Sequence, residues 1–411
     1  MPRRVTVVTA GHLSTCPRML KAADALHDAG YTVRVVSVKQ TPWAAASDAR
    51  LRSTRSWRWD VIDARRDSAP VRWLVNGTRW RSARSLARRL RGRRPHALTI
   101  RAFSRVHDAL VREILREPAD FIYGGTTGAL AAIAAAGRRS GTPFGVDFED
   151  FHCGEHAPSG EGKLLNELAA AIMADVTRDA EFVTAGSVAI ANACRERFGV
   201  DPVTINNVFP LPPQPPAAAN GGPPRIYWFS QTIGAGRGLD HLIRGLGRLA
   251  RPCELHLRGV SAPGVVEQLR RLAAEVAPEL EIHVHAPADP LAMVDSCRAH
   301  SIGAAMEPGF SVNNALSLSN KALTYPLAGL PVILTNTLGH RALAADLADG
   351  AVCCAPGDVE AVADGVRRWL DTPAAFRRAR EASWTAARTR WHWEHPRERG
   401  ALLECVERAV A

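Results

Sequence analysis

The residues of this sequence best suited to chemistry lie between Glu307 and Lys321. A strand predicted at 302–306 delivers Glu307, a turn at Gly309 exposes backbone, and Ser319 is a predicted N-cap for the helix that follows. The first turn of such a helix presents free N–H groups and a positive dipole end, to which Lys321 adds a full charge. These groups predict a diphosphate site, with Glu307 placed to hold sugar hydroxyls. The alternative is a surface glutamate beside an ordinary capped helix.

A second phosphate-binding element is predicted in the glycine-rich segment 230–238, SQTIGAGRG. Ser230 and Gln231 open the segment directly after a predicted strand at 225–229. Glycines between a strand and a helix, Gly236 among them, let the backbone approach a phosphate. Arg237 supplies a cation, so the segment complements the charge of Lys321.

Polar residues also follow two predicted strands of the N-terminal half, at 5–10 and 144–147. These residues are Gly11, His12, Glu149, Asp150 and His152. Loops at strand ends are where such folds place ligand contacts. We interpret them as contacts for a molecule that accepts a sugar, on the acceptor side of the site. Asp150 and His152 are favoured as contacts of the sugar or of this acceptor. A solvated loop is the alternative for both groups.

The elements that must position these residues alternate regularly along the chain. A strand at 5–10, a helix at 18–29 and a strand at 32–38 open a series that continues to about 205, and a similar series runs from 225 to 334. Such alternation predicts an α/β fold with two Rossmann-like domains, each a parallel sheet covered by helices, which face each other across a cleft.

The predicted domain borders follow from the same pattern. Seven prolines and two glycines in 210–224 mark an interdomain linker between the domains 1–209 and 225–385. Residues 386–411 contain two tryptophans ahead of an amphipathic helix. We expect this last segment to pack back on the N-terminal domain.

Glu307, the segment 319–321 (SNK) and the segment 328–332 (AGLPV) resemble the donor-site signature of the family 4 retaining glycosyltransferases. This resemblance implies the GT-B fold, with a nucleotide-sugar donor bound mainly by the C-terminal domain. The family has a second glutamate for the ribose of the nucleotide, and here that position is Thr324. The family also has an arginine and a lysine near 231–237. Arg237 resembles the second of these, whereas Gln231 or Thr232 replaces the first.

The resemblance implies retaining sugar transfer, in which Arg237, Lys321 and the helix end near Ser319 stabilise the leaving diphosphate in place of a metal. We therefore expect no metal ligand and no cofactor beyond the nucleotide-diphosphate sugar as co-substrate. The implied catalytic residues are Glu307, Arg237, Lys321, Asp150 and His152. The implied donor-binding residues are Ser230, Gln231, Gly236, Arg237, Glu307, Gly309, Phe310, Ser319, Asn320, Lys321 and Thr324.

Positive charge is concentrated in one segment. The chain has a formal net charge of +11, and Arg65 to Arg105 holds 13 arginines against one acid. Ala83, Leu86, Ala87 and Leu90 recur at helical spacing beside these arginines, which predicts a basic amphipathic helix at an anionic membrane surface. The acceptor would then be lipid-linked or acidic. A merely solvated arginine face and a phosphate-rich polymer are the alternatives, but we expect no nucleic-acid partner.

Three alternative functions stay open: a nucleotide-sugar epimerase of the same fold, an inverting transferase with His12 as base, and a non-catalytic protein that binds a membrane or partner. The eight cysteines are scattered without zinc-site spacing, which predicts reduced thiols. No apolar run is long enough for a signal peptide or a spanning helix. We expect a cytoplasmic enzyme, held peripherally on the inner face of the membrane if the basic segment binds there.

Overall fold

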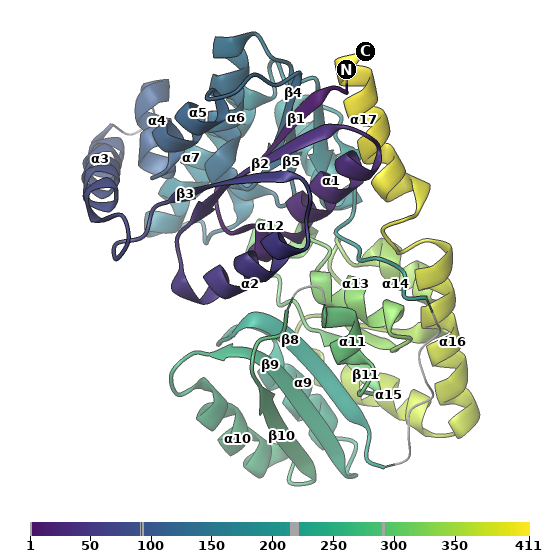
Figure 1. The fold of residues 1–411 in the computed structure, drawn as a ribbon. Helices are drawn as coiled ribbons and strands as arrows, with labels where there is room; N and C mark the ends of the chain where they lie inside the picture. The colour runs from purple at the N-terminus through teal and green to yellow at the C-terminus, as the bar shows by residue number, and fades with distance from the viewer. Residues whose placement is uncertain (1, 91, 93, 214–221, 290–291) are drawn as a thin grey trace. The chain divides into compact units, whose positions relative to one another are not determined.

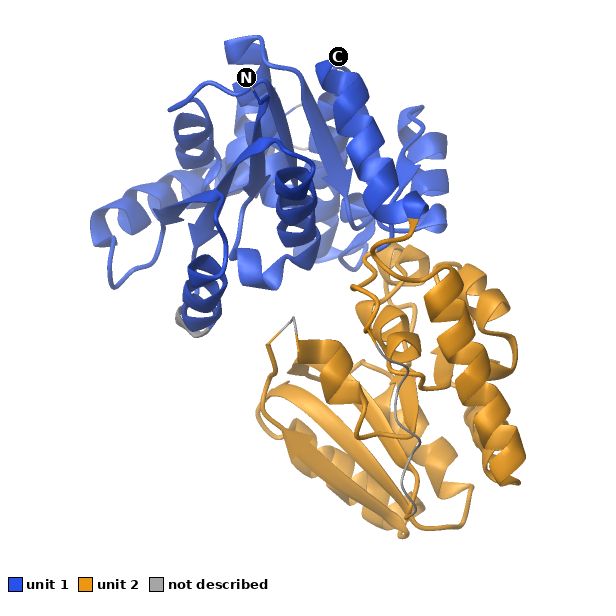
Figure 2. Cartoon of the chain, turned by 45° about the vertical axis from the view of Figure 1, so that its right-hand side comes forward, with its two compact units in different colours: residues 1–206, 396–411 blue, residues 207–395 orange. Residues whose placement is uncertain are grey.

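The structure is a computed structural model and describes residues 2–90, 92, 94–213, 222–289 and 292–411. The chain divides into two compact units (Figure 2). Unit 1 consists of Met1–Asn206 and Pro396–Ala411, and unit 2 consists of Asn207–His395.

Unit 1 is built on a seven-stranded parallel sheet with the strand order β3-β2-β1-β4-β5-β6-β7. The strands are β1 Arg4–Thr9, β2 Thr32–Lys39, β3 Arg58–Asp63, β4 Phe121–Gly125, β5 Phe144–Phe148, β6 Phe182–Ala185 and β7 Val203–Thr204. In β1 every residue after Arg4 is buried, and β4 and β5 are buried throughout. Strands buried on both faces need helices on both sides, as the predicted alternation requires.

Helices flank this sheet (Figure 1). They are α1 Pro17–Asp28, α2 Pro42–Ser53, α3 Pro70–Arg89, α4 His96–Phe103, α5 His107–Ile114, α6 Thr127–Ser140, α7 Gly160–Val176, α8 Val188–Phe198 and α17 Ala401–Val410. Short 3-10 turns lie at Leu13–Thr15 and His152–Gly154, and a π-helical turn lies at Pro396–Gly400. Proline at the first position of α1 and left-handed glycines after α6 and α8 mark helix ends.

The C-terminal segment completes unit 1. Helix α17 packs beside α1 and β4. Ahead of it, the buried Glu398 accepts hydrogen bonds from the backbone N–H of Asn206 (2.5 Å) and from its Nδ2 (2.8 Å). A buried carboxylate needs such donors. These hydrogen bonds therefore hold the C-terminal segment in unit 1, together with the packing of α17.

Unit 2 is built on a six-stranded parallel sheet with the strand order β10-β9-β8-β11-β12-β13. The strands are β8 Arg225–Ile233, β9 Cys253–Ser261, β10 Leu280–His285, β11 Ile302–Ala305, β12 Val332–Thr335 and β13 Ala351–Cys354. The helices are α9 Leu239–Gly247, α10 Val265–Val276, α11 Met293–Cys297, α12 Val312–Leu316, α13 Asn320–Leu327, α14 Arg341–Leu347, α15 Val359–Leu370 and α16 Pro373–Thr389, with a 3-10 turn at Ala348–Gly350. Apolar side chains of β8, β9, α9, α10 and α15 form its main core.

Two parallel sheets flanked by helices confirm the predicted α/β class with two Rossmann-like units. The unit borders differ from our domain borders, because residues 207–209 and 386–395 lie in unit 2. The backbone N–H of Trp393 donates to Phe209 O (2.9 Å), and Trp391 Nε1 donates to Asp346 (2.9 Å). Residues 214–221 of the predicted linker lie outside the described residues.

Candidate active site

Glu307 and Lys321 form a buried ion pair in unit 2. Lys321 Nζ lies 2.7 Å from Glu307 Oε1, and the two side chains are 12% and 8% exposed. Glu307 follows the carboxyl end of β11, and Lys321 lies in the first turn of α13. The ammonium also lies 5.6 Å from the ring centroid of the buried Trp228, within the range of a cation–π contact. The structure thus joins the two charged residues that the sequence placed fourteen positions apart.

Asn314 organises the loop between these residues. Its Nδ2 donates to Glu307 Oε2 (3.2 Å), and its Oδ1 accepts from the backbone N–H of Gly309 (2.6 Å). Gly309 has a φ of 71°, in the left-handed region that favours glycine. Asn314 therefore holds both the carboxylate and the turn. Asn314 was not predicted, because one amide in a polar loop carries no distinctive sequence signal.

The surroundings of Glu307 keep it ionised. Burial alone would raise its pKa, but the charge and hydrogen bond of Lys321, with help from Asn314, hold the pKa at about 2. Glu307 is accordingly a hydrogen-bond acceptor at any physiological pH. A carboxylate in this state suits sugar hydroxyls, which need an acceptor fixed in place.

His340 is a further polar residue of this site. It is fully buried, and its Nδ1 lies 2.9 Å from Thr335 O at the end of β12. Burial lowers the pKa of His340, against the opposing effects of the Thr335 bond and the nearby charge of Glu307. Its Nε2 is buried without a hydrogen-bond partner in the described part of the chain. His340 lies beyond the predicted motif in sequence, and only the pairing of β11 with β12 brings it near Glu307.

The first turn of α13 is capped as predicted, since Ser319 Oγ accepts from Ala322 N at 3.4 Å. Asn320 Oδ1 accepts from Asn207 Nδ2 at 3.0 Å. Thr324, at the position of the family's ribose-binding glutamate, is fully buried and donates to Asn320 O at 2.6 Å. Its hydroxyl is thus engaged within its own helix, and a donor-binding role for Thr324 stays a prediction. Phe310, by contrast, is 60% exposed.

The glycine-rich segment approaches Glu307 through its last residue. Gly238 is the N-cap of α9 with a φ of 71°, and a Cβ there would overlap the carbonyl oxygen of Met306. Gly236 is also left-handed, and Arg237 between them is half-buried. Ser230 and Gln231 lie within β8, because a bulge between Phe229 and Thr232 lets this strand continue to Ile233. The loop is thus shorter than we predicted, and its cation follows the strand closely.

In unit 1, both ring nitrogens of His12 are engaged. Nδ1 lies 2.6 Å from Asp48 Oδ2, and Nε2 accepts from the backbone N–H groups of Gln40 and Thr41, each at 3.0 Å. The buried imidazole therefore fastens α2 to the loop that contains Gly11, and its lone pair is occupied. This geometry argues against His12 as the base of an inverting transferase. No local pattern predicts this contact, because Asp48 lies in α2, 36 residues after His12.

The carboxylates after β5 have separate environments. Asp147 is fully buried and receives two hydrogen bonds from Arg18, at 2.8 and 2.5 Å. Glu149 and Asp150 are half-buried, and loss of water raises the pKa of Glu149 to about 7. His152 is buried against Glu155: burial would lower its pKa, but that carboxylate raises it. The acceptor-side role of Gly11, His12, Glu149, Asp150 and His152 stays a prediction.

Comparison with known proteins places this geometry in context. Residues 17–212 match the family model of the glycosyl transferase 4-like domain. No curated protein matches the chain in sequence. Among solved structures, a glycosyltransferase from Rickettsia africae is 13% identical with a TM-score of 0.67, covering 100% of this chain and 99% of its own.

Two further structures share the fold. Anabaena HepE in complex with UDP is 15% identical, has a TM-score of 0.63 and covers 99% of both chains. The sucrose-phosphate synthase of Thermosynechococcus elongatus is 12% identical, with a TM-score of 0.73 and full coverage of both chains. The chain therefore has the GT-B fold of these glycosyltransferases. Within that fold, the match to the glycosyl transferase 4-like domain covers residues 17–212.

Proposed function

We propose that unit 2 binds a nucleotide-diphosphate sugar and that the chain transfers its sugar to an acceptor with retention and without a catalytic metal. The observation that carries this proposal is the buried Glu307–Lys321 pair at the carboxyl end of β11, beside the first turn of α13. Ligands of parallel α/β sheets bind at this edge. The complex of Anabaena HepE with UDP supports a uridine nucleotide as the first ligand to test.

In this proposal the charged residues have different roles. Glu307 stays ionised and accepts hydrogen bonds from the sugar, while Lys321, the N–H groups of α13 and Arg237 face the diphosphate. Because Glu307 already offsets the charge of Lys321, Arg237 provides the additional positive charge for the leaving group. Fixed cations of this kind can replace a metal as a stabiliser of the developing negative charge.

The test compares Glu307→Gln, Lys321→Gln and the double variant. Breaking a buried ion pair from one side leaves an unpaired charge, which costs about 3–5 kcal/mol of stability. The double variant should recover that stability, yet neither single nor double variant should show the UDP-induced rise in melting temperature or the sugar transfer of the wild type. A double variant that binds UDP like the wild type would contradict the proposal and reduce the pair to a structural element.

Retention and metal independence have their own measurements. The anomeric configuration of the product, read by NMR, must match that of the donor. Transfer should persist after dialysis against EDTA. Activity that disappears with EDTA and returns with Mg²⁺ or Mn²⁺ would show that a divalent ion, rather than Arg237 and Lys321, offsets the leaving group. An isomerised donor formed without acceptor would favour the epimerase alternative.

We also propose that α3 places the enzyme peripherally on an anionic membrane, on its cytoplasmic face, where a lipid-linked acceptor would lie. No helix in the described residues is long and apolar enough to span a bilayer. The exposed apolar residues of this region are Val71, Leu74, Val75, Leu86 and Leu90. Exposed arginines accompany them, which is the composition of an interfacial helix.

This surface is not the one that the sequence indicated. Ala87 is fully buried and packs with Ala102, Leu164 and Leu168, and Ala83 packs against the same cluster. Only Leu86 and Leu90 of the predicted apolar face remain exposed. The alanines pack α3 against α4 and α7, and the N-terminal turns of α3, with Val71, Leu74 and Val75, supply the rest of the exposed face.

A further inference from the structure

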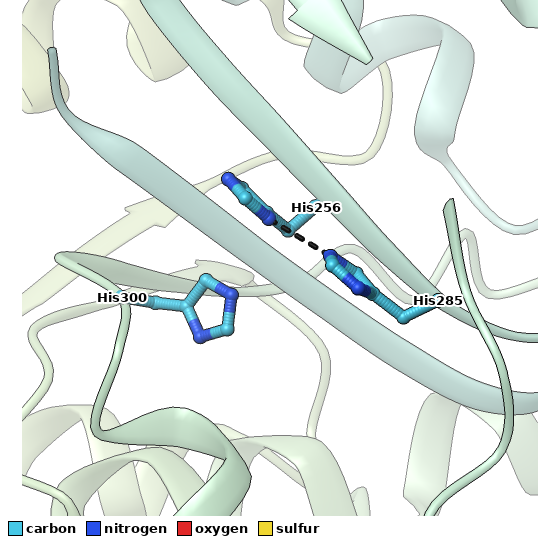
Figure 3. Close-up of side chains that lie close together, drawn as sticks. All are labelled: His256, His285 and His300. Atoms are coloured by element: carbon cyan, nitrogen blue, oxygen red, sulfur yellow. Dashed lines mark hydrogen bonds between the residues drawn. The ribbon is translucent and has the colours of Figure 1, made fainter. Parts of the chain in front are cut away.

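Three histidines gather on one face of the sheet in unit 2, away from the ion pair of Glu307. His256 lies in β9, His285 ends β10, and His300 precedes β11; Figure 3 shows the three rings. One ring nitrogen of each lies within 4.8 Å of the others. His256 pairs with Tyr227 of β8, which in turn pairs with Gly303 of β11. Gly303 lies four residues before Glu307 along the chain.

The sheet geometry explains why these side chains meet. Leu255 and Leu257 enter the main core of unit 2, so His256 between them points to the opposite face. The ring of His300 stacks on Tyr227 with centroids 4.0 Å apart, which fixes it on that same face. His300 is buried, and its Nδ1 is without a hydrogen-bond partner in the described residues. A buried polar atom without a partner is costly, and a ligand is one way to satisfy it.

The hydrogen bonds of His256 define its tautomer. Glu254 Oε2 accepts from His256 Nε2 at 2.8 Å, so this nitrogen carries the proton, and Arg225 in turn donates to Glu254. Nδ1 then carries the lone pair of the ring, which accepts a hydrogen bond from His285 Nε2 at 2.9 Å. A carboxylate behind a histidine is the arrangement that orients imidazole ligands of metals.

The electrostatics keep the three imidazoles in the form that metals bind. Burial lowers the pKa of His256 and of His285, and it lowers the pKa of His300 to about 4. Burial thus opposes protonation of the three rings, and a metal ion binds the unprotonated nitrogen.

We propose that His256, His285 and His300 bind a divalent transition-metal ion, Zn²⁺ in the first place, through three imidazole nitrogens, with water in the fourth position. Imidazole suits Zn²⁺, Ni²⁺ and Cu²⁺ far better than Mg²⁺ or Ca²⁺. Tetrahedral Zn²⁺ with bonds of 2.0–2.1 Å separates ligand nitrogens by about 3.3 Å, so the His256–His285 pair must open by about 0.4 Å and His300 must rotate inward. For His285 to bind the ion through Nε2, the proton that this nitrogen donates to His256 moves to Nδ1 of the same ring, so His285 stays a neutral imidazole.

This site goes beyond the proposed sugar transfer and does not depend on it. Its ligands come from β9, β10 and the segment before β11, whereas the donor residues follow β11 and begin α13. An ion here ties three segments of unit 2 together, so its expected effect is stability rather than chemistry at the sugar. These histidines lie up to 44 positions apart in the sequence, so no local spacing predicts a metal site.

A second group competes for the same ion, because Glu254, His256 and His283 also lie close together. In that group, Glu254 would be a ligand rather than the residue that orients His256. The two arrangements share only His256. His285→Gln and His283→Gln therefore distinguish them as matched substitutions on the same strand.

The experiment measures Zn²⁺ binding to the full chain, without an added histidine tag, by calorimetry and metal analysis after dialysis. A Cys353→Ser background removes the exposed thiol as a competing ligand. We expect one Zn²⁺ per chain and a Zn²⁺-dependent rise in melting temperature. Glu254→Gln should weaken binding by about 10–100-fold, the usual effect of losing an orienting carboxylate. His285→Gln and His300→Gln should weaken it further, and His283→Gln should leave it unchanged.

The metal-free melting temperature of each variant separates loss of a ligand from loss of the fold. If His285→Gln is destabilised without metal, His285→Asn replaces it, because the side chain of His285 is half-buried. Absence of a stoichiometric Zn²⁺ site in the parent chain would overturn the proposal. Equal binding by His285→Gln and the parent would also overturn it, as would a His283→Gln variant that loses binding as severely. UDP binding and sugar transfer are measured in parallel, so failure of the metal site is distinguishable from failure of the proposed function.

Discussion

Glu307 and Lys321 stabilise unit 2 as an ion pair and are also the residues proposed to bind the donor. The energetics of the pair allow both roles. The pair is buried, so its attraction is little screened, and Asn314 satisfies the second carboxylate oxygen. Each charge is paired before any ligand arrives. A ligand that engages Lys321 and Glu307 therefore meets groups already held in place, which is the condition for tight binding of a charged substrate.

The acid stability of the protein should report on this carboxylate. Because the pKa of Glu307 falls from 4.5 to about 2 on folding, its contribution of about 3 kcal/mol is complete above pH 4.5 and is lost between pH 4.5 and 2. Glu307→Gln should therefore flatten the decline in unfolding free energy over that interval, as measured by urea unfolding at a series of pH values. The double variant with Lys321→Gln should show the same flattening without the loss of stability at pH 7. An unchanged acid limb in both variants would mean that Glu307 is not stabilised as its contacts indicate.

At the scale of elements, the approach of α9 to β11 depends on one glycine. Gly238 has a φ of 71°, and a side chain there would overlap Met306 O. Gly264 is a matched position, because it caps α10 with a φ of 75° and has open space around its Cβ position. The two glycines therefore share backbone strain but differ in crowding.

Substitution of these glycines separates the two effects. Gly264→Ala should cost about 1–2 kcal/mol, the penalty for a left-handed residue that is not glycine. Gly238→Ala should cost clearly more and should lower donor affinity, because the loop with Arg237 must move away from Met306. Melting temperatures and UDP titrations of both variants measure this difference. Equal losses in both would show that crowding against β11 is unimportant for the site.

The sequence predicted elements well wherever periodicity decides the structure. The predicted strand at 302–306 and the Ser319 cap correspond to β11 and α13, since their patterns are local. Contacts between elements were not predictable. Asp48 reaches His12, and His340 reaches the surroundings of Glu307, through strand order that no local pattern encodes. The burial of Thr324 was unpredictable for the same reason, because it comes from packing between elements, whereas the motif indicates only the residue type.

For the whole molecule, the charge of α3 predicts an interaction with membranes. This helix stands at the outer margin of unit 1 in Figure 1. Its exposed arginines include Arg79 and Arg89, whereas Arg84 and Arg88 pair with Glu161 of α7. Arg79 and Arg89 are therefore available to lipid phosphates.

Charge reversal tests this surface. Each basic residue near an anionic bilayer contributes about 1 kcal/mol, so Arg79→Glu with Arg89→Glu should weaken binding to phosphatidylserine vesicles by at least about 30-fold. Arg377→Glu with Arg378→Glu on α16 changes the net charge equally and should have little effect. Flotation assays at fixed ionic strength measure both. Equal losses in the two variants would attribute binding to net charge, and steep salt-dependent binding to oligonucleotides would favour the phosphate-rich polymer instead.

Unit 1 is assembled from two stretches of chain, with all of unit 2 encoded between them. Synthesis proceeds from the amino end, so unit 2 has its complete set of residues while unit 1 still lacks its last helix. Until residues 396–411 leave the ribosome, the Asn206 groups that Glu398 accepts from have no carboxylate to meet. Unit 1 is therefore begun first and completed last, and a nascent chain halted after residue 395 would carry a complete unit 2 joined to a unit 1 that still lacks residues 396–411.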